Sequence, residues 1–349
     1  MHTDPAHSVI PLERYRDLVA AISGRSDGWE ESYWLRLAAQ AAVMCPEPTV
    51  EVAGRIRETA SLLLNHATWY QTLASPARFL TAAMLIQHQI PATTFLIEHA
   101  RIAQDFGAAG LRHGRFPEIV AVLIMLMAPE DPDHPPQRLL EIERIARVYG
   151  LMRRCHWWLT GPEDLPACAA LAQCVDPAEA VMARVEDAYQ QLHRLGLATG
   201  DHLQTAANLL PLGGIFIDRA IGRYRELVAA LGRSGRAFAV EHYCPLAVLA
   251  LLDHDAEVVV GRLLGVLDEL DLMQPQERGE ANVLIASDLV FLDLVRFGRD
   301  QRLICDAHGL MQVRRQVHVF NLSSAVLLSQ VEPELVLLAE SSAPTAWPG

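Results

Sequence analysis

Acidic and imidazole side chains recur in the polar turns that precede a series of short apolar segments. Two turns are the richest, because Asp201 stands next to His202 and Glu241 stands next to His242. Carboxylate oxygens and imidazole nitrogens bind divalent metal ions and can also transfer protons. If the two turns occupy equivalent places in neighbouring units about 10 Å apart, their side chains can reach one shared ion. The candidate metal ligands are therefore His202 and His242.

The same turns have a purely structural explanation. Acids are favoured in the first turn of any helix, where they cap free backbone N–H groups and compensate the helix dipole. No His-Glu-x-x-His or His-x-x-x-His spacing supports a metal site, so we predict no cofactor and keep a divalent metal as the alternative. The candidate ligand-binding residues of these turns are Arg78, Glu118, Asp164, Asp201, His202, Glu241, His242 and Glu280.

Several catalytic classes are excluded by residues that the sequence lacks. All 29 basic residues other than histidine are arginine, so a Schiff-base lysine, a pyridoxal-phosphate lysine and a P-loop lysine are impossible. The nucleophile motif Gly-x-Ser-x-Gly and the dinucleotide motif Gly-x-Gly-x-x-Gly are also missing. Whether the protein is an enzyme stays open at this point.

The apolar segments behind the turns repeat along the chain. Each carries an Ala-rich phrase, such as RLAAQAAVM, FLTAAMLIQ and HLQTAANLL. The copies follow one another at intervals of about 40 residues, which is typical of two-helix repeats. The alanines that anchor the copies are Ala38, Ala82, Ala121, Ala169, Ala206, Ala247, Ala286 and Ala325.

The two helices of each repeat differ in character. The first is long and amphipathic: in the segment 183–197, Val185, Ala188, Tyr189 and Leu192 share one face. The second is apolar almost all round and must be buried between neighbours. We therefore predict an all-α fold, an α-α superhelix (solenoid) of about eight helix hairpins. It comprises a flexible N-terminus over residues 1–9, a single helical-repeat domain over 10–330 and a C-terminal tail over 331–349.

Composition supports a well-packed domain. Of the 349 residues, 51% are hydrophobic and 20% are charged, which excludes disorder. The formal net charge of −13 and the lack of a basic stripe argue against nucleic acid as a partner. No uninterrupted apolar run is long enough for a bilayer, and the N-terminus lacks the pattern of a signal peptide, so we expect a cytoplasmic protein without a membrane partner.

Three longer segments carry a family resemblance. They are HWWLTGPEDLPACAALA (156–172), EDAYQQLHRLGLATGDHLQTAANLLPL (186–212) and YRELVAALGRSGRAFAVEHYCPLAVLALL (224–252). The chain resembles a bacterial family known as domain of unknown function 4003 over most of residues 10–295. The resemblance implies an all-helical bacterial protein, and it brings no activity and no catalytic residues. The lysine-rich surface more usual in that family is absent here.

Two functions are compatible with such an array. An open solenoid favours a binding or scaffold protein that offers a concave groove to a peptide or protein partner. The alternative is an enzyme whose hairpins close into an α/α toroid around the acidic and histidine turns, possibly with a metal. Contact between the first and the last hairpins would support the ring. The sequence leaves the oligomeric state open.

Overall fold

A computed structural model describes residues 10–24, 29–66, 72–111, 116–127, 138–273, 279–297 and 307–330. Within these ranges the protein is all-α, with fifteen α-helices, four short 3-10 helices and no strand. The predicted all-α class is therefore confirmed. The predicted N-terminal segment 1–9 and the tail 331–349 lie outside the described residues.

Long outer helices alternate with shorter inner helices along the chain. The outer set is α1 (Ile10–Ser23), α3 (Thr49–His66), α5 (Ala92–Ala108), α7 (Arg138–Cys155), α9 (Ala178–Arg194), α11 (Ile217–Arg233) and α13 (Ala256–Met273). The inner set is α2 (Trp29–Ala41), α4 (Ala77–Gln87), α6 (Phe116–Leu126), α8 (Leu165–Ala172), α10 (Asp201–Leu209), α12 (Tyr243–Leu249) and α14 (Glu280–Phe297). The 3-10 helices are η1 (Thr72–Ala74), η2 (Pro162–Asp164), η3 (Leu210–Gly213) and η4 (Val240–His242).

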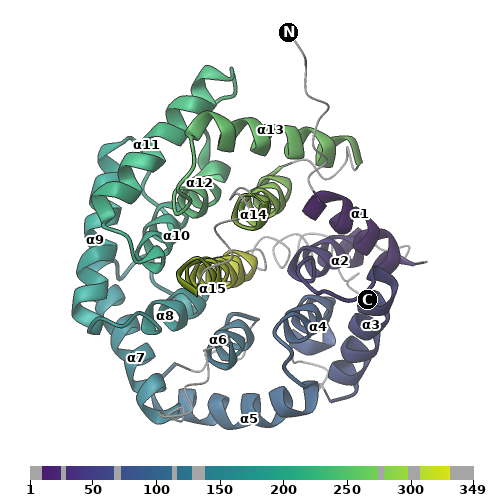
Figure 1. The fold of residues 1–349 in the computed structure, drawn as a ribbon. Coiled ribbons are helices and arrows are strands. Elements are labelled where there is room, and N and C mark those ends of the chain that lie inside the picture. Colours follow the sequence, from purple (N-terminus) through teal and green to yellow (C-terminus); the bar gives the residue numbers. More distant parts are fainter. Residues whose placement is uncertain are drawn as a thin grey trace, which may run out of the picture.

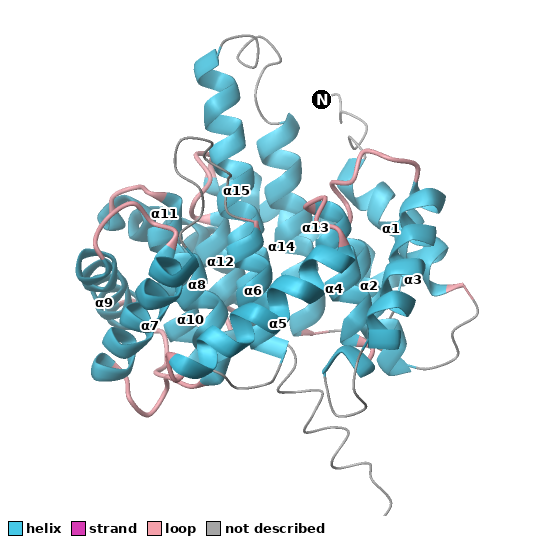
Figure 2. Cartoon of the chain, turned by 90° about the horizontal axis from the view of Figure 1, so that it is seen from below, coloured by secondary structure: helices cyan, strands magenta, loops and turns pink. Residues whose placement is uncertain are grey.

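The hairpins close into a ring (Figure 1). Inner helix α14 packs against both α1 and α2, so the seventh hairpin meets the first. The expectation of an open solenoid is therefore wrong, and so is the expected eighth hairpin. In its place a single helix, α15 (Ala307–Gln330), runs through the centre of the ring. In the perpendicular view, α14 and α15 extend beyond the ring on one side (Figure 2).

Burial explains why the centre is filled. The outer helices bury one stripe, for example Val181, Val185, Ala188 and Leu192 of α9. The inner helices are buried on all sides, and every residue from Phe116 to Met125 of α6 is buried. An open centre would expose the side of each inner helix that faces the ring axis. Helix α15 covers these sides by packing against α6, α8, α12 and α14.

Helix α15 is itself buried where it crosses the ring. Its apolar residues Phe320, Leu322, Ala325 and Val326 are all in the core. Phe320 stacks on Phe291 of α14, with ring centroids 5.2 Å apart and an interplanar angle of 26°. This aromatic stacking stabilises the contact between the central helix and the ring beyond the contribution of buried apolar area.

The ring closes through polar contacts. Arg36 of α2 donates to Asn282 Oδ1 of α14, and Gln40 of α2 donates to Asp288 Oδ2 of α14. Ser324 Oγ of α15 also donates to Asp288 Oδ2, at 2.6 Å. Asp288 is fully buried. The first hairpin, the last hairpin and the central helix therefore meet at one carboxyl group.

In two hairpins an arginine of the outer helix bonds to the connector that follows the inner helix. Arg14 of α1 donates to the carbonyl oxygens of Val43 (2.9 Å) and Glu47 (2.6 Å) that follow α2. Arg144 of α7 donates to the carbonyl oxygen of Cys174 (2.6 Å) after α8. These carbonyls belong to the connectors just past α2 and α8, so each arginine holds a connector in place and its charge complements the dipole of the helix end.

None of the helices in the described ranges combines the length and the apolar character that a bilayer crossing requires. This agrees with the sequence, in which apolar runs are short.

The Ala-rich phrase leads to a first prediction. Ala247 of α12 is fully buried between neighbouring helices. Ala247→Leu adds volume to a close-packed seam and should lower the free energy of unfolding by about 1–3 kcal/mol. Chemical denaturation measures this change. Ala183→Leu, on the exposed face of outer helix α9, is the matched control and should have almost no effect. Equal stability of the two variants would contradict the assigned packing.

Asp288 gives a second prediction. Burial raises the pKa of its carboxyl group from 3.8 to about 7. The folded protein therefore keeps a proton that the unfolded chain has lost, and the free energy of unfolding falls as pH rises from about 4 to about 7. Asp288→Asn keeps an acceptor for Ser324 and removes the titration. Between pH 5 and 7.5 the wild type should lose roughly 2–3 kcal/mol more than the variant. Parallel pH profiles in chemical denaturation would contradict this.

Candidate functional site

The first turns of the inner helices lie at one rim of the ring, which we call the N-rim. Each hairpin reverses the chain, so all inner helices begin on the same side. Contacts between consecutive turns agree with this: Cys244 of α12 donates through Sγ to the carbonyl oxygen of His202 on α10, at 3.4 Å. The ring therefore brings several of the predicted residues to one rim, as expected from the repeat.

Two of the predicted residues act as caps. Asp164 accepts the Gly161 backbone N–H through Oδ2 at 3.0 Å, and His242 accepts the Ala239 N–H through Nδ1 at 3.2 Å. In both turns the backbone donor precedes the side chain by three residues, so the two hairpins use the same local device. Both side chains are buried. Capping accounts for these two positions without a ligand.

Asp164 has a second partner inside the ring. Its Oδ1 accepts from Gln204 Nε2 of α10, at 2.9 Å. Burial raises the pKa of the Asp164 carboxyl group to about 7, although the bonds from Gly161 and Gln204 act in the opposite direction. The neighbouring charges of Glu163 and Asp201 raise this pKa further. Burial also lowers the pKa of His242, which is consistent with a neutral ring that accepts a hydrogen bond.

His202 and Glu280 form a direct pair between two of the predicted residues. His202 Nδ1 lies 3.5 Å from Glu280 Oε1, and both side chains are about half exposed. The pair joins α10 to α14 across the start of α12, where Cys244 lies. His202 and His242 thus have different partners, a carboxylate and a backbone amide.

The remaining predicted residues have other surroundings. Arg78 donates to the carbonyl oxygen of Ala74 at 3.3 Å and stacks over the Phe79 ring at 4.7 Å. Glu118 is buried in the first turn of α6. Asp201 is exposed, and Glu241 is partly exposed. Over the described ranges, no group of three or more His, Cys, Asp or Glu side chains is arranged to hold a metal ion.

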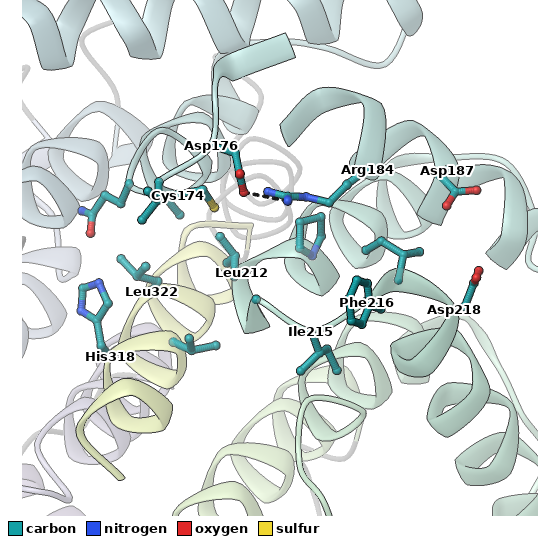
Figure 3. A pocket seen from close by; sticks show the side chains of 17 residues that line it. Cys174, Asp176, Arg184, Asp187, Leu212, Ile215, Phe216, Asp218, His318 and Leu322 are labelled. Atoms are coloured by element: carbon teal, nitrogen blue, oxygen red, sulfur yellow. Dashed lines mark hydrogen bonds and ion pairs between the residues drawn. The ribbon is translucent and has the colours of Figure 1, made fainter. Parts of the chain in front are cut away.

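A groove opens at the opposite rim, the C-rim, where the inner helices end (Figure 3). It has a volume of about 700 Å³ and lies between the ends of α8 and η3, the outer helices α9 and α11, and α15. The lining residues are Ala170, Gln173, Cys174, Val175, Asp176, Arg184, Asp187, Pro211, Leu212, Gly214, Ile215, Phe216, Ile217, Asp218, His318, Val319 and Leu322.

Two apolar side chains at this groove are almost entirely exposed. Val175 is 99% exposed and Phe216 is 88% exposed, each in a connector between hairpins. They adjoin a lining that includes Leu212, Ile215 and Leu322. A single exposed apolar residue is common, but exposed residues that continue an apolar groove are typical of a binding surface.

The charged residues of the groove are mostly acidic. Asp176 pairs with Arg184, with Oδ2 to Nη1 at 2.7 Å. Asp187 and Asp218 have a different arrangement: Nε2 of Gln191 lies 3.2 Å from Asp187 Oδ1 and 2.8 Å from Asp218 Oδ1. Burial lowers the pKa of His318, so this residue brings no positive charge at neutral pH. The lining therefore carries three carboxylates and one guanidinium.

Sequence analysis did not identify this groove. Its residues come from connectors and from α15, which the repeat pattern treats as turns and as a final hairpin. One signal was available in the sequence. Val175, Ile215 and Phe216 are bulky apolar residues in short connectors, beside Asp176 and the Gly213-Gly214 pair. Ile215 packs partly against the core, whereas Val175 and Phe216 are exposed and the turn chemistry does not require them.

The fold and the two rims define the class of the protein: a closed α/α ring of helix hairpins filled by its own last described helix. A family model described as "Protein of unknown function (DUF4003)" matches residues 24–295. The chain belongs to this family, and the resemblance noted in the sequence is confirmed. The match ends within α14, so α15 lies outside the matched residues. Neither a curated protein nor a solved structure matches the chain.

The caps lead to a third prediction. His242→Ala removes the acceptor for the Ala239 N–H and should lower the free energy of unfolding by about 1–2 kcal/mol. His242→Asn restores an acceptor and should recover part of the loss. His202→Ala, at a half-exposed position in the neighbouring hairpin, is the control and should change stability by less than about 0.5 kcal/mol. Thermal and chemical unfolding measure all three variants. A larger loss for His202→Ala than for His242→Ala would contradict the capping role.

Proposed function

We propose that this protein is a binding or scaffold protein that holds an apolar segment of a protein partner in the groove at the C-rim. The observation that carries the proposal is the exposure of Val175 and Phe216 beside a groove of about 700 Å³. Burying Phe216 alone against a partner would remove a large aromatic surface from water, which is a common source of binding energy.

The position of the groove differs from that expected for an open solenoid. A solenoid offers its concave face, but here the corresponding faces of the inner helices are covered by α15. Among the described residues, nothing covers the C-rim in this way at the groove, where two connectors meet α15. The proposed partner site is therefore on the rim.

The alternative function, catalysis in the centre of an α/α toroid, has less support. Helix α15, whose residues Ala325 and Val326 are buried, runs through the centre of the ring, where a substrate would have to bind. At the N-rim, Asp164 and His242 are used as caps. A binding function requires neither an open centre nor free acidic groups at that rim.

Site-specific photo-crosslinking in the native host tests the proposal. A benzophenone amino acid at position 216 should give a discrete crosslinked product with another protein. The control is the same substitution at Val50, which is 76% exposed in the first turn of outer helix α3. Position 50 lies at the same rim in a different hairpin. Identical products from both positions, or no product from position 216, would contradict the proposed function.

A further inference from the structure

We propose that the groove selects a cationic partner segment, in which a bulky apolar side chain is followed closely by an arginine or lysine. This inference rests on the proposed binding function and names the chemistry of its partner. Two features of the groove carry it: the apolar lining around Phe216, and a pair of carboxylates beside it, Asp187 and Asp218.

The apolar lining fixes one part of the partner. Phe216 stands at the start of α11, with Ile215 before it, and α15 contributes Val319 and Leu322 to the opposite side (Figure 3). A side chain placed between Phe216 and α15 would contact aromatic and aliphatic groups from two directions. A Leu, Phe or Met side chain suits such a lining, and its burial is favourable by about 1.5–3 kcal/mol.

The two carboxylates fix the charge. One amide nitrogen, Gln191 Nε2, lies within hydrogen-bond distance of both Asp187 and Asp218. Their oxygens are therefore no more than about 6 Å apart, a separation at which like charges repel. In the described part of the chain, neither carboxylate has a cation within ion-pair distance, whereas Asp176 is neutralised by Arg184. A guanidinium presents several N–H donors in one plane and can bond to both carboxylates at once.

The charge of the groove also disfavours other segments. An acidic segment would meet three carboxylates and one guanidinium, on a chain whose formal net charge is −13. A neutral apolar segment would partly exclude water from Asp187 and Asp218 without replacing it by a cation, which is unfavourable. Selectivity then follows from repulsion as much as from attraction.

The test uses two labelled synthetic peptides of fourteen or so residues. Both carry Leu and Phe at helical spacing; the other positions are mainly Arg in one peptide and Glu in its twin. Fluorescence anisotropy with the 349-residue chain should show at least ten-fold tighter binding of the Arg peptide at 50 mM NaCl, and a weaker preference at 300 mM.

Variants of groove residues show whether the Arg peptide binds in the groove. Asp187→Asn combined with Asp218→Asn should weaken binding of the Arg peptide by about five- to ten-fold and reduce its salt dependence. The control, Glu51→Gln combined with Glu226→Gln, makes the same change in net charge on exposed faces of α3 and α11 and should leave affinity unchanged. Phe216→Ser should weaken binding of the Arg peptide, and Val50→Ser should not.

The outcomes separate this inference from the proposed function. Equal binding of both peptides with loss in Phe216→Ser would overturn the charge selectivity and keep the groove as a binding site. Equal effects of the two double variants would also overturn it, because the attraction would then arise from net charge alone. Failure of both peptides to bind, with no product from position 216, would overturn both. Self-association lost in Phe216→Ser would assign the groove to a second copy of the chain and overturn the cationic partner.

Discussion

The fold depends on one constraint: the inner helices are apolar on every side and must be covered on every side. In a hairpin array the outer helices and the neighbouring hairpins cover three sides of each inner helix. The fourth side faces the axis. Closure of the ring alone would leave the axis-facing sides of these helices exposed in a channel, and exposure of that much apolar surface would cost a free energy comparable to the roughly 5–15 kcal/mol by which domains are stable. Helix α15 removes the problem by filling the channel.

The polar seam then determines which hairpins meet. Apolar surfaces along the ring are similar to one another, so burial by itself specifies poorly where the array ends. Arg36 and Gln40 on α2 match Asn282 and Asp288 on α14, and Ser324 brings α15 to the same point. A mismatched pairing would leave a buried carboxyl or guanidinium group without partners. We infer that these contacts contribute more to the uniqueness of the closure than to net stability, as is known for some buried polar groups.

Much of the ring could be predicted from the sequence, because each inner helix is marked by its own Ala-rich apolar segment. The alanines that anchor the seven inner helices are all buried, and so is the eighth anchor, Ala325. Ala325, however, lies on α15 and not in a hairpin. The phrase therefore reports burial on all sides, which an inner helix and a central helix need equally. Closure was harder to predict because it depends on a small rotation between successive hairpins. The signal for it was the presence of Arg36, Gln40, Asn282 and Asp288 inside otherwise apolar helices.

The groove, unlike the ring, could not be predicted from local sequence patterns. At the N-rim, sequence reasoning found residues that share a position in the repeat, and at Asp164 and His242 that position is explained by local capping. The groove at the C-rim has no repeat signature, because it forms where two connectors meet α15. At that rim Arg14 and Arg144 bond to backbone carbonyls of the connectors that follow α2 and α8. These bonds use the backbone and not the exposed side chains, so an exposed Phe216 there gains nothing for folding. A bulky apolar residue with no structural role, next to paired carboxylates, is best explained by what it binds.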